Sequence, residues 1–447
     1  MLRSLNISLA GARAGSAMIA DKALNRLLPG RASNPLLARE AQNLVKKLGE
    51  LKGTYVKVGQ MLAMVGEFVL PVELTEALHT LESATAPLPW SEVEGILQTR
   101  LGSRYAELDV SPTPIGVASL AQVHRATVRS SGDQIVLKFL YPGVPESIDN
   151  DFNAVARMLK LTRWIKASNG FDDWMGQLRE QLLHEVDYPR EIAMTCRAAE
   201  ELAGDSRYRV PRIYHEFCCP DLIAMEYLEG VSVNDASVTS LSLERRNRLA
   251  RNMLDLFFKE VYEWHLLQSD PNFGNYRIAF DATNDQLILL DFGSMLAVEG
   301  EFFCALGDAI FAAQHQHKEP LIDALKRLGC LHAGSSPTAC DTFANFCVEI
   351  MEPMREANEL PPQFLNAQGE YRWSETKLMK RAALIAGRSV GNRDFDLPSE
   401  KFALVTRKLI GVFTFISILE AEFNGAPILE QYRDSMATRT ARMNGNP

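Results

Sequence analysis

Two stretches of the chain indicate most clearly how it folds: Asp270-Pro-Asn-Phe-Gly-Asn275 and, a little further on, Gln286-Leu-Ile-Leu-Leu-Asp-Phe-Gly293. The first places an aspartate and an asparagine at D-x-x-x-x-N spacing. The second is a short apolar run that predicts a buried strand followed by a sharp turn. At the end of such a strand Asp291 can hold Mg²⁺, with the side-chain oxygen of Asn275 as a second ligand. Asp270 is then available as a general base or as a carboxylate that orients water.

Two weaker patterns precede these stretches. Gly116-x-Ala118-x-x-Ala121-x-Val123 matches the kinase loop GxGxxGxV with alanine in place of two glycines, and Val136-Leu-Lys138 matches the end of VAIK. A small-residue turn lets backbone N–H groups approach phosphate, and such a lysine grips the α- and β-phosphates and pairs with a helix glutamate. Taken alone, they fit a common turn and an edge-strand lysine that points to solvent. All four patterns in kinase order predict a kinase-type site for ATP and Mg²⁺. The residues expected to contact the nucleotide in the loop are Gly116, Val117, Ala118 and Ser119.

Composition narrows the possible classes of protein. The chain has 447 residues, enough for about three domains or two large ones. Its composition, with 47% hydrophobic and 23% charged residues, is typical of a folded protein. A net charge of −9 argues against nucleic-acid binding, and seven cysteines without CxxC spacing predict free thiols. The longest uncharged apolar stretch, Leu409–Leu419, is shorter than the ~20 residues that a bilayer requires, so it predicts a core helix.

The remaining periodicity predicts helices around a small group of strands. Helices are expected over 36–105, over 147–204 and over most of the chain after 241, strands over 118–128, 134–140 and within 209–230, and a turn over 111–116. This order predicts an α+β, bilobal layout with a helical extension before it. The predicted parts are a basic segment over 1–39, a helical extension over 40–110, a kinase-like N-lobe with a helical insert over 111–232, a helical C-lobe over 233–435 and a tail over 436–447.

Five further stretches have the form of a known family's signatures. They are Lys57-Val-Gly-Gln60 (KxGQ), Ala118-Ser119, Lys138 followed by Tyr141-Pro-Gly-Val144, Glu185-Val-Asp187 (ExD) and Gln268-Ser-Asp-Pro-Asn272. On these residues the sequence, from about 45 to 430, closely resembles the UbiB/AarF family of atypical protein-kinase-like proteins. The resemblance implies a protein-kinase-like fold whose helical extension folds over the nucleotide cleft. It also implies a role in ubiquinone (isoprenoid quinone) biosynthesis.

The resemblance assigns roles to several charged residues. Lys57 would lie on a helix of the extension and be held by Glu185 or Asp187. Glu191, four residues after Asp187, is expected on the same helix face. Either Glu185 or Glu191 could pair with Lys138, and the spacing leaves both open.

Two further features concern the nucleotide. Glu226-Tyr-Leu228 fits the hinge whose backbone meets adenine. Gly116 stands where the family has alanine, which predicts a more flexible start of the loop, while Ala118 keeps the alanine-like position nearest to phosphate.

A conventional protein kinase is not expected. The HRD triplet is replaced by Gln268-Ser-Asp270, so the arginine that would bind a phosphorylated activation loop is missing. Few residues separate Gly293 from the next helical pattern, and no APE motif follows, which leaves no platform for a peptide. The acceptor is therefore expected to be a small molecule, a lipid or water. Two functions remain: an ATPase or atypical kinase, or a nucleotide-gated lipid-binding scaffold without substrate phosphorylation.

The first 39 residues suggest a membrane partner. They carry six Lys and Arg residues against one Asp, with Leu2, Leu5 and Leu9 at helical spacing. A transit peptide, a membrane-surface helix and a frayed terminal helix share this composition. The expected partners are ATP, a lipid or quinone precursor, and an anionic membrane or quinone-biosynthesis proteins. The expected location is the bacterial cytoplasm with peripheral membrane contact, or else the matrix side of the mitochondrial inner membrane.

Overall fold

The computed structural model describes residues 39, 41–46, 48, 54–66, 72–80, 87–162, 171–281, 284–390 and 398–433. The predicted tail and all but residue 39 of the predicted basic segment lie outside these residues. The chain forms two units: the first joins the part up to Ala193 with Arg212–Tyr227, and the second joins Met194–Pro211 with the part from Leu228 onward. Residues 194–211, which the sequence places in the N-lobe, thus belong to the second unit. The α+β, bilobal layout is confirmed.

The first unit is built on an antiparallel sheet with strand order β1-β2-β3-β5. Its strands are β1 (Leu108–Val117), β2 (Ala121–Val128), β3 (Gln134–Leu140) and β5 (Leu222–Glu226). Side chains alternate between the two faces of each strand, so β3 sends Leu137 and Phe139 to one core and Val136 and Leu140 to the other. Lys138 therefore belongs to the face of Val136 and Leu140.

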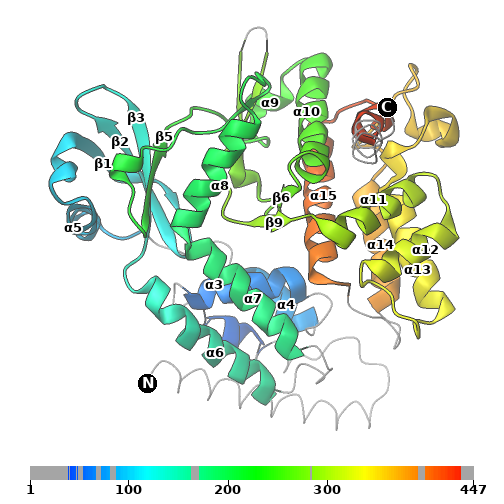
Figure 1. The fold of residues 1–447 in the computed structure, drawn as a ribbon, viewed down its shortest axis with the longest axis horizontal. Helices are drawn as coiled ribbons and strands as arrows, with labels where there is room; N and C mark the ends of the chain where they lie inside the picture. The colour runs from blue at the N-terminus through cyan, green and yellow to red at the C-terminus, as the bar shows by residue number, and fades with distance from the viewer. Residues whose placement is uncertain are drawn as a thin grey trace, which may run out of the picture. The chain divides into compact units, whose positions relative to one another are not determined.

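Helices cover both faces of this sheet (Figure 1). The face with Leu137 packs against α5 (Trp90–Leu101) through Val93 and Leu97. The face with Val136 shares a core with several helices. They are α3 (Thr54–Gly66), α4 (Val72–His79), α6 (Val144–Thr162), α7 (Phe171–Val186) and the start of α8 (Tyr188–Glu201). Among them, α3 contacts α4, α6 and α7.

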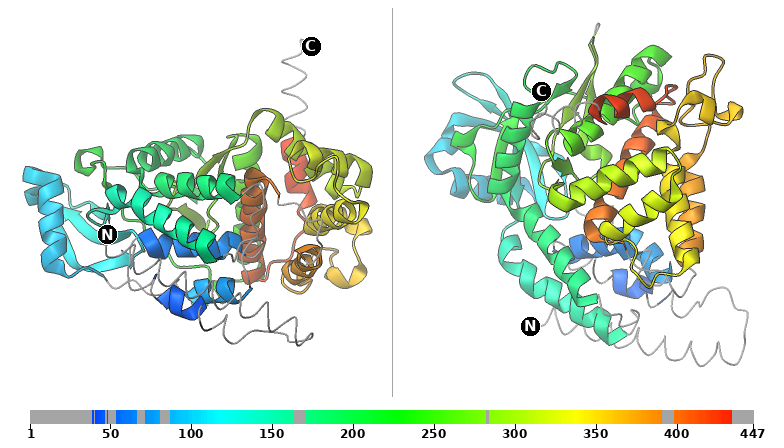
Figure 2. Two further views of the ribbon diagram at one scale, coloured as in Figure 1. Left: turned by 90° about the horizontal axis from the view of Figure 1, so that it is seen from below. Right: turned by 45° about the vertical axis from the view of Figure 1, so that its right-hand side comes forward.

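The second unit is mainly helical. Its long helices are α10 (Leu243–Tyr262), α11 (Gly300–Gln314), α12 (Lys318–Arg327), α13 (Pro337–Ile350), α14 (Leu378–Val390) and α15 (Glu400–Ile418), with a short α9 (Ala236–Thr239). Helix α15 packs along α10, and α11 to α14 gather together (Figure 2). Leu409, Val412 and Phe413 are buried, which confirms that this apolar stretch is a core helix. Among the described helices, none is long and apolar enough to cross a membrane.

Five short strands accompany these helices. They are β4 (Tyr208–Arg209), β6 (Leu266–Gln268), β7 (Tyr276–Ala279), β8 (Gln286–Leu289) and β9 (Met295–Ala297). They form one sheet with order β4-β8-β7 and a separate β6-β9 pair. The sequence predicted β8 because it holds most of a continuous apolar run before a sharp turn, but it missed β6, β7 and β9, which are three or four residues long.

The turn predicted over 111–116 was wrong. These residues lie within β1, where Pro114 pairs with His124 and Gly116 with Val123. The register shifts on both sides of Pro114. Proline lacks an N–H for the ladder, so it is tolerated at such an irregular place on an edge strand, and two prolines here imitate a turn in the sequence.

Candidate active site

Lys138 of β3 is paired with a buried glutamate. Its Nζ lies 2.6 Å from Oε1 of Glu191 on α8, a side chain with only 3% of its surface exposed. The ammonium also lies 5.3 Å from the centre of the Tyr188 ring. β3 is flanked by β2 and β5, so the interpretation of Lys138 as an edge-strand lysine is excluded. Of the two acids that the spacing left open for Lys138, the structure selects Glu191.

Lys57 of α3 forms an ion pair with Glu185 of α7. Asp187 lies between α7 and α8, and its carboxylate accepts a hydrogen bond from the N–H of Arg190 at 3.0 Å. It therefore caps the N-terminus of α8. The expectation that Asp187 and Glu191 share a helix face was wrong because Asp187 precedes the helix that carries Glu191.

The loop between β1 and β2 contains fewer residues than the sequence predicts. Gly116 is part of β1, and neither Gly116 nor Ala118 has a positive φ. A Cβ at Gly116 would meet Val123 only at 3.5 Å, so glycine is not required there. The N–H of Ala118 donates to the carbonyl of Ala121 at 2.8 Å, within the hairpin. A phosphate would therefore compete with this bond at Ala118.

Glu226 and Leu228 flank the point where the chain passes from the first unit to the second. The N–H of Glu226 donates to Arg212 O at 2.8 Å and that of Tyr227 donates to Gln134 O at 2.9 Å. Leu228 is buried. Because both preceding amides are used inside the first unit, Leu228 is the better candidate for a backbone contact with adenine.

The short strands of the second unit gather the other predicted residues. Tyr276 pairs with Leu289, and the N–H of Leu290 donates to Asn275 O at 3.0 Å. Asn275 and Asp291 thus lie at the same end of the β7–β8 pair. The side chain of Gln268, which ends β6, donates to the backbone carbonyl of Asp291 at 3.2 Å. The loop that holds Asp270 therefore begins and ends beside Asp291.

Hydrogen bonds orient the three polar side chains of this group. Nδ2 of Asn275 donates to Oδ2 of Asp270 at 2.9 Å. In a side-chain amide the nitrogen donates hydrogen bonds and the oxygen accepts them. Because the nitrogen of Asn275 is used by Asp270, Oδ1 of Asn275 is the atom that can accept a hydrogen bond or bind a metal ion. Oδ1 of Asp291 accepts from the N–H of Gly293 at 2.9 Å. A carboxylate and an amide oxygen on adjoining strand ends are hard oxygen donors that suit Mg²⁺, which keeps water and phosphate as its other ligands.

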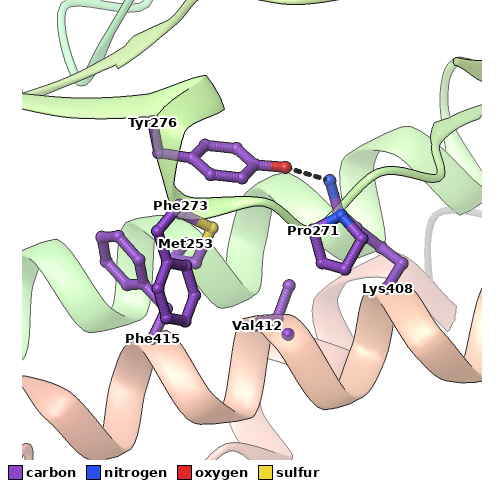
Figure 3. A pocket seen from close by; sticks show the side chains of 8 residues that line it. Met253, Pro271, Phe273, Tyr276, Lys408, Val412 and Phe415 are labelled. Carbon is purple, nitrogen blue, oxygen red and sulfur yellow. Dashed lines mark hydrogen bonds between the residues drawn. The ribbon is translucent and has the colours of Figure 1, made fainter. Parts of the chain in front are cut away.

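A fully buried lysine lies behind this loop (Figure 3). Nζ of Lys408, on α15, donates to Oε1 of Gln268 at 2.9 Å and to the hydroxyl of Tyr276 at 2.7 Å, and it lies 3.2 Å from Oε2 of Glu260. Burial lowers the pKa of Lys408 and raises that of Glu260, while their mutual attraction opposes both effects. The small pocket beside it, lined by Pro271 and apolar side chains, leaves no space for a water molecule.

The sequence did not indicate that Lys408 and Arg407 of α15 contact the loop that holds Asp270. Lys408 directly precedes the apolar stretch Leu409–Leu419, and a lysine at the border of a core helix is usually taken as a solvated end. Arg407 beside it forms an ion pair with Asp270, with Nη2 and Oδ1 3.1 Å apart. Both residues are far from the loop in sequence, so no local spacing connects them with it.

Comparison with known proteins identifies the family. Residues 80–324, more than half of the chain, match the ABC1 atypical kinase-like domain. The chain belongs to this family. The resemblance to UbiB/AarF proteins is thereby confirmed.

Two relatives bear the name atypical kinase COQ8, mitochondrial. The one from Schizosaccharomyces pombe is 29% identical over 70% of this chain and 51% of its own length, so the chain spans about half of that relative. The one from Saccharomyces cerevisiae is 24% identical over 87% of this chain and 75% of its own length. Among solved structures, Rv3197 from Mycobacterium tuberculosis, in a complex with erythromycin, matches with a TM-score of 0.59. That match covers 89% of this chain and 96% of Rv3197 at 24% identity, and it shows a shared fold.

Proposed function

We propose that this ABC1 kinase-like protein binds Mg-ATP and hydrolyses it or transfers its terminal phosphoryl group to a small molecule or lipid in ubiquinone biosynthesis. The observation that carries the proposal is the orientation of Asn275. Its side-chain nitrogen donates to the carboxylate of Asp270, which leaves its side-chain oxygen as an acceptor, and its backbone pairs with Leu290, the residue before Asp291. That arrangement suits a carboxylate base next to a divalent-metal site, which phosphoryl transfer requires.

Each residue then has a defined part. Asp291 and Asn275 would hold Mg²⁺, which supplies charge neutralisation at the phosphates. Lys138, oriented by Glu191, would grip the phosphates through its ammonium. Asp270 would accept a proton from the acceptor or orient water. Ser119, Val117 and Leu228 would contact the nucleotide through the loop and the hinge.

The acceptor is inferred from the space after Gly293. Strand β9 begins at Met295 and α11 at Gly300, so only a few residues separate them from the metal-binding turn. Peptide substrates need an extended segment there, which favours a small molecule, a lipid or water. The COQ8 names of the relatives support a quinone precursor. The proposal includes peripheral contact with an anionic membrane, in the bacterial cytoplasm or on the matrix side of the mitochondrial inner membrane.

The test is Mg-ATP binding and ATP turnover by the full chain, with and without anionic liposomes. The Asp291→Asn variant should lose Mg-ATP binding while its unfolding temperature without nucleotide stays unchanged, because one carboxylate is the main metal ligand. A matched control is Asp308→Asn, since Asp308 is exposed and forms an ion pair with Arg327 at 2.7 Å. An undiminished thermal shift with Mg-ATP in Asp291→Asn would remove Asp291 from the site. Binding without turnover in wild type would favour a nucleotide-gated scaffold instead.

A further inference from the structure

The carboxylate of Asp270 is held at both oxygens by different parts of the second unit. Oδ2 accepts from Asn275, which lies on the same loop, at 2.9 Å. Oδ1 accepts from Nη2 of Arg407 on α15 at 3.1 Å. Two donors on opposite oxygens fix the rotation of the carboxylate about its last bond. Removal of either donor would leave the carboxylate restrained by the other hydrogen bond alone, so its orientation would be less well defined.

Helix α15 is itself fixed against the loop next to Arg407. Lys408 is 1% exposed and bonds Gln268 and Tyr276, which lie before and after the loop. One turn further on, Gly411 approaches so closely that a Cβ there would overlap with the ring of Pro271. Residues at i and i+4 share a helix face, so Arg407 and Gly411 meet the loop from one side. The helix that carries the Arg407 guanidinium is therefore held firmly against the loop.

The Arg407–Asp270 pair itself contributes little to stability. The two side chains are 31% and 35% exposed, and solvent screens an ion pair at such exposure. The main effect of the ion pair is therefore on the orientation of the Asp270 carboxylate. A measurement of enzyme activity detects that orientation, whereas a measurement of unfolding temperature does not.

We propose that Arg407 is a positioning residue for Asp270. It holds one carboxylate oxygen so that the group faces its acceptor in a single orientation. The inference rests on the proposed function, in which Asp270 acts on water or on an acceptor hydroxyl. Correct orientation of a reacting group is a large part of catalysis, and a displacement of about 1 Å can cost on the order of 100-fold in rate. An ordinary surface ion pair would have no such effect.

The test uses the full chain in steady-state ATP turnover, with the Mg-ATP dissociation constant and the unfolding temperature measured for each variant. Arg407→Ala should lower kcat roughly 10- to 100-fold, while the KM for ATP and the unfolding temperature stay near wild type. Arg407→Lys, which keeps a donor and the charge, should recover part of kcat. Lys401→Ala removes an exposed cation from the same helix and should leave kcat unchanged.

A double variant separates positioning from an independent effect. In the Asp270→Asn background, Arg407→Ala should cause almost no further loss in kcat, because the carboxylate that Arg407 orients is already replaced. If wild type is active, Asp270→Asn is inactive and Arg407→Ala keeps full kcat, the positioning role is overturned and the proposed function stands. A raised KM at unchanged kcat also overturns it, since Arg407 would then contact the nucleotide. If wild type has no turnover, or Asp270→Asn is fully active, the proposed function fails and the inference with it.

Discussion

Substitution of Lys408 by methionine should destabilise the second unit strongly. Methionine keeps the length of the apolar stem but removes the charge and the hydrogen-bond donors. Among the described residues, Glu260, which is 1% exposed, would keep the N–H of Gln268 at 3.3 Å, and the hydroxyl of Tyr276 would lose the ammonium that donates to it. Removing one partner of a buried ion pair costs about 3–5 kcal/mol because the other charge stays buried and uncompensated. For a unit of this size, that corresponds to a fall in unfolding temperature on the order of 10 °C.

The measurement is a double-mutant cycle by urea and thermal unfolding. Lys408→Met combined with Glu260→Gln should be clearly more stable than Lys408→Met alone, because no charge is then left unpaired. The control is Lys259→Met on the same helix as Glu260. Lys259 pairs with the partly exposed Glu263 at 3.0 Å, so its loss should cost less than about 1 kcal/mol. If the two substitutions simply add, or if Lys408→Met costs no more than the control, the buried pair does not support the loop as argued.

Two further predictions concern the first unit. Ala118→Gly removes a Cβ from the loop and should change the affinity for Mg-ATP and increase autophosphorylation, and adding Lys57→Ala should increase autophosphorylation further. Incubation with labelled ATP measures this, with Asp291→Asn as the inactive control. If affinity and labelling are unchanged in both variants, the short segment after Gly293 alone restrains protein phosphorylation. Burial lowers the pKa of His124, whose Nδ1 lies 2.8 Å from Ser111 O and whose Nε2 lies 2.8 Å from the amide of Gln122. The unfolded chain therefore binds more protons below about pH 6.5, so stability present above that pH should fall as the pH drops from 7.5 to 5.5. His124→Gln should flatten this dependence of the unfolding temperature, whereas the exposed His332→Gln should not, and equal slopes in wild type and His124→Gln would contradict the assignment.

The features that could be predicted from the sequence are those that depend on the local order of residues. Asp291 after an apolar strand, Lys138 within one and a core helix at Leu409–Leu419 all follow from periods of two or 3.6 residues within a short window. The order of strands and helices predicted the bilobal layout, and the family signatures added its likeness to a protein kinase and the choice of Lys57 as a residue of interest. The local features can be recognised in the sequence because each is a pattern among residues that are near neighbours along the chain.

Which charged residues pair with one another depends on how the helices and strands pack in space. Asp187 and Glu191 are four residues apart, yet the break between α7 and α8 makes the first a helix cap and leaves the second to pair with Lys138. Arg407 reaches Asp270 only because α15 packs against the loop, with Gly411 allowing the close approach. Ion pairs act through distance in space, and chain folding brings together residues that no spacing relates. For that reason the loop's support on α15 left no trace in the sequence pattern.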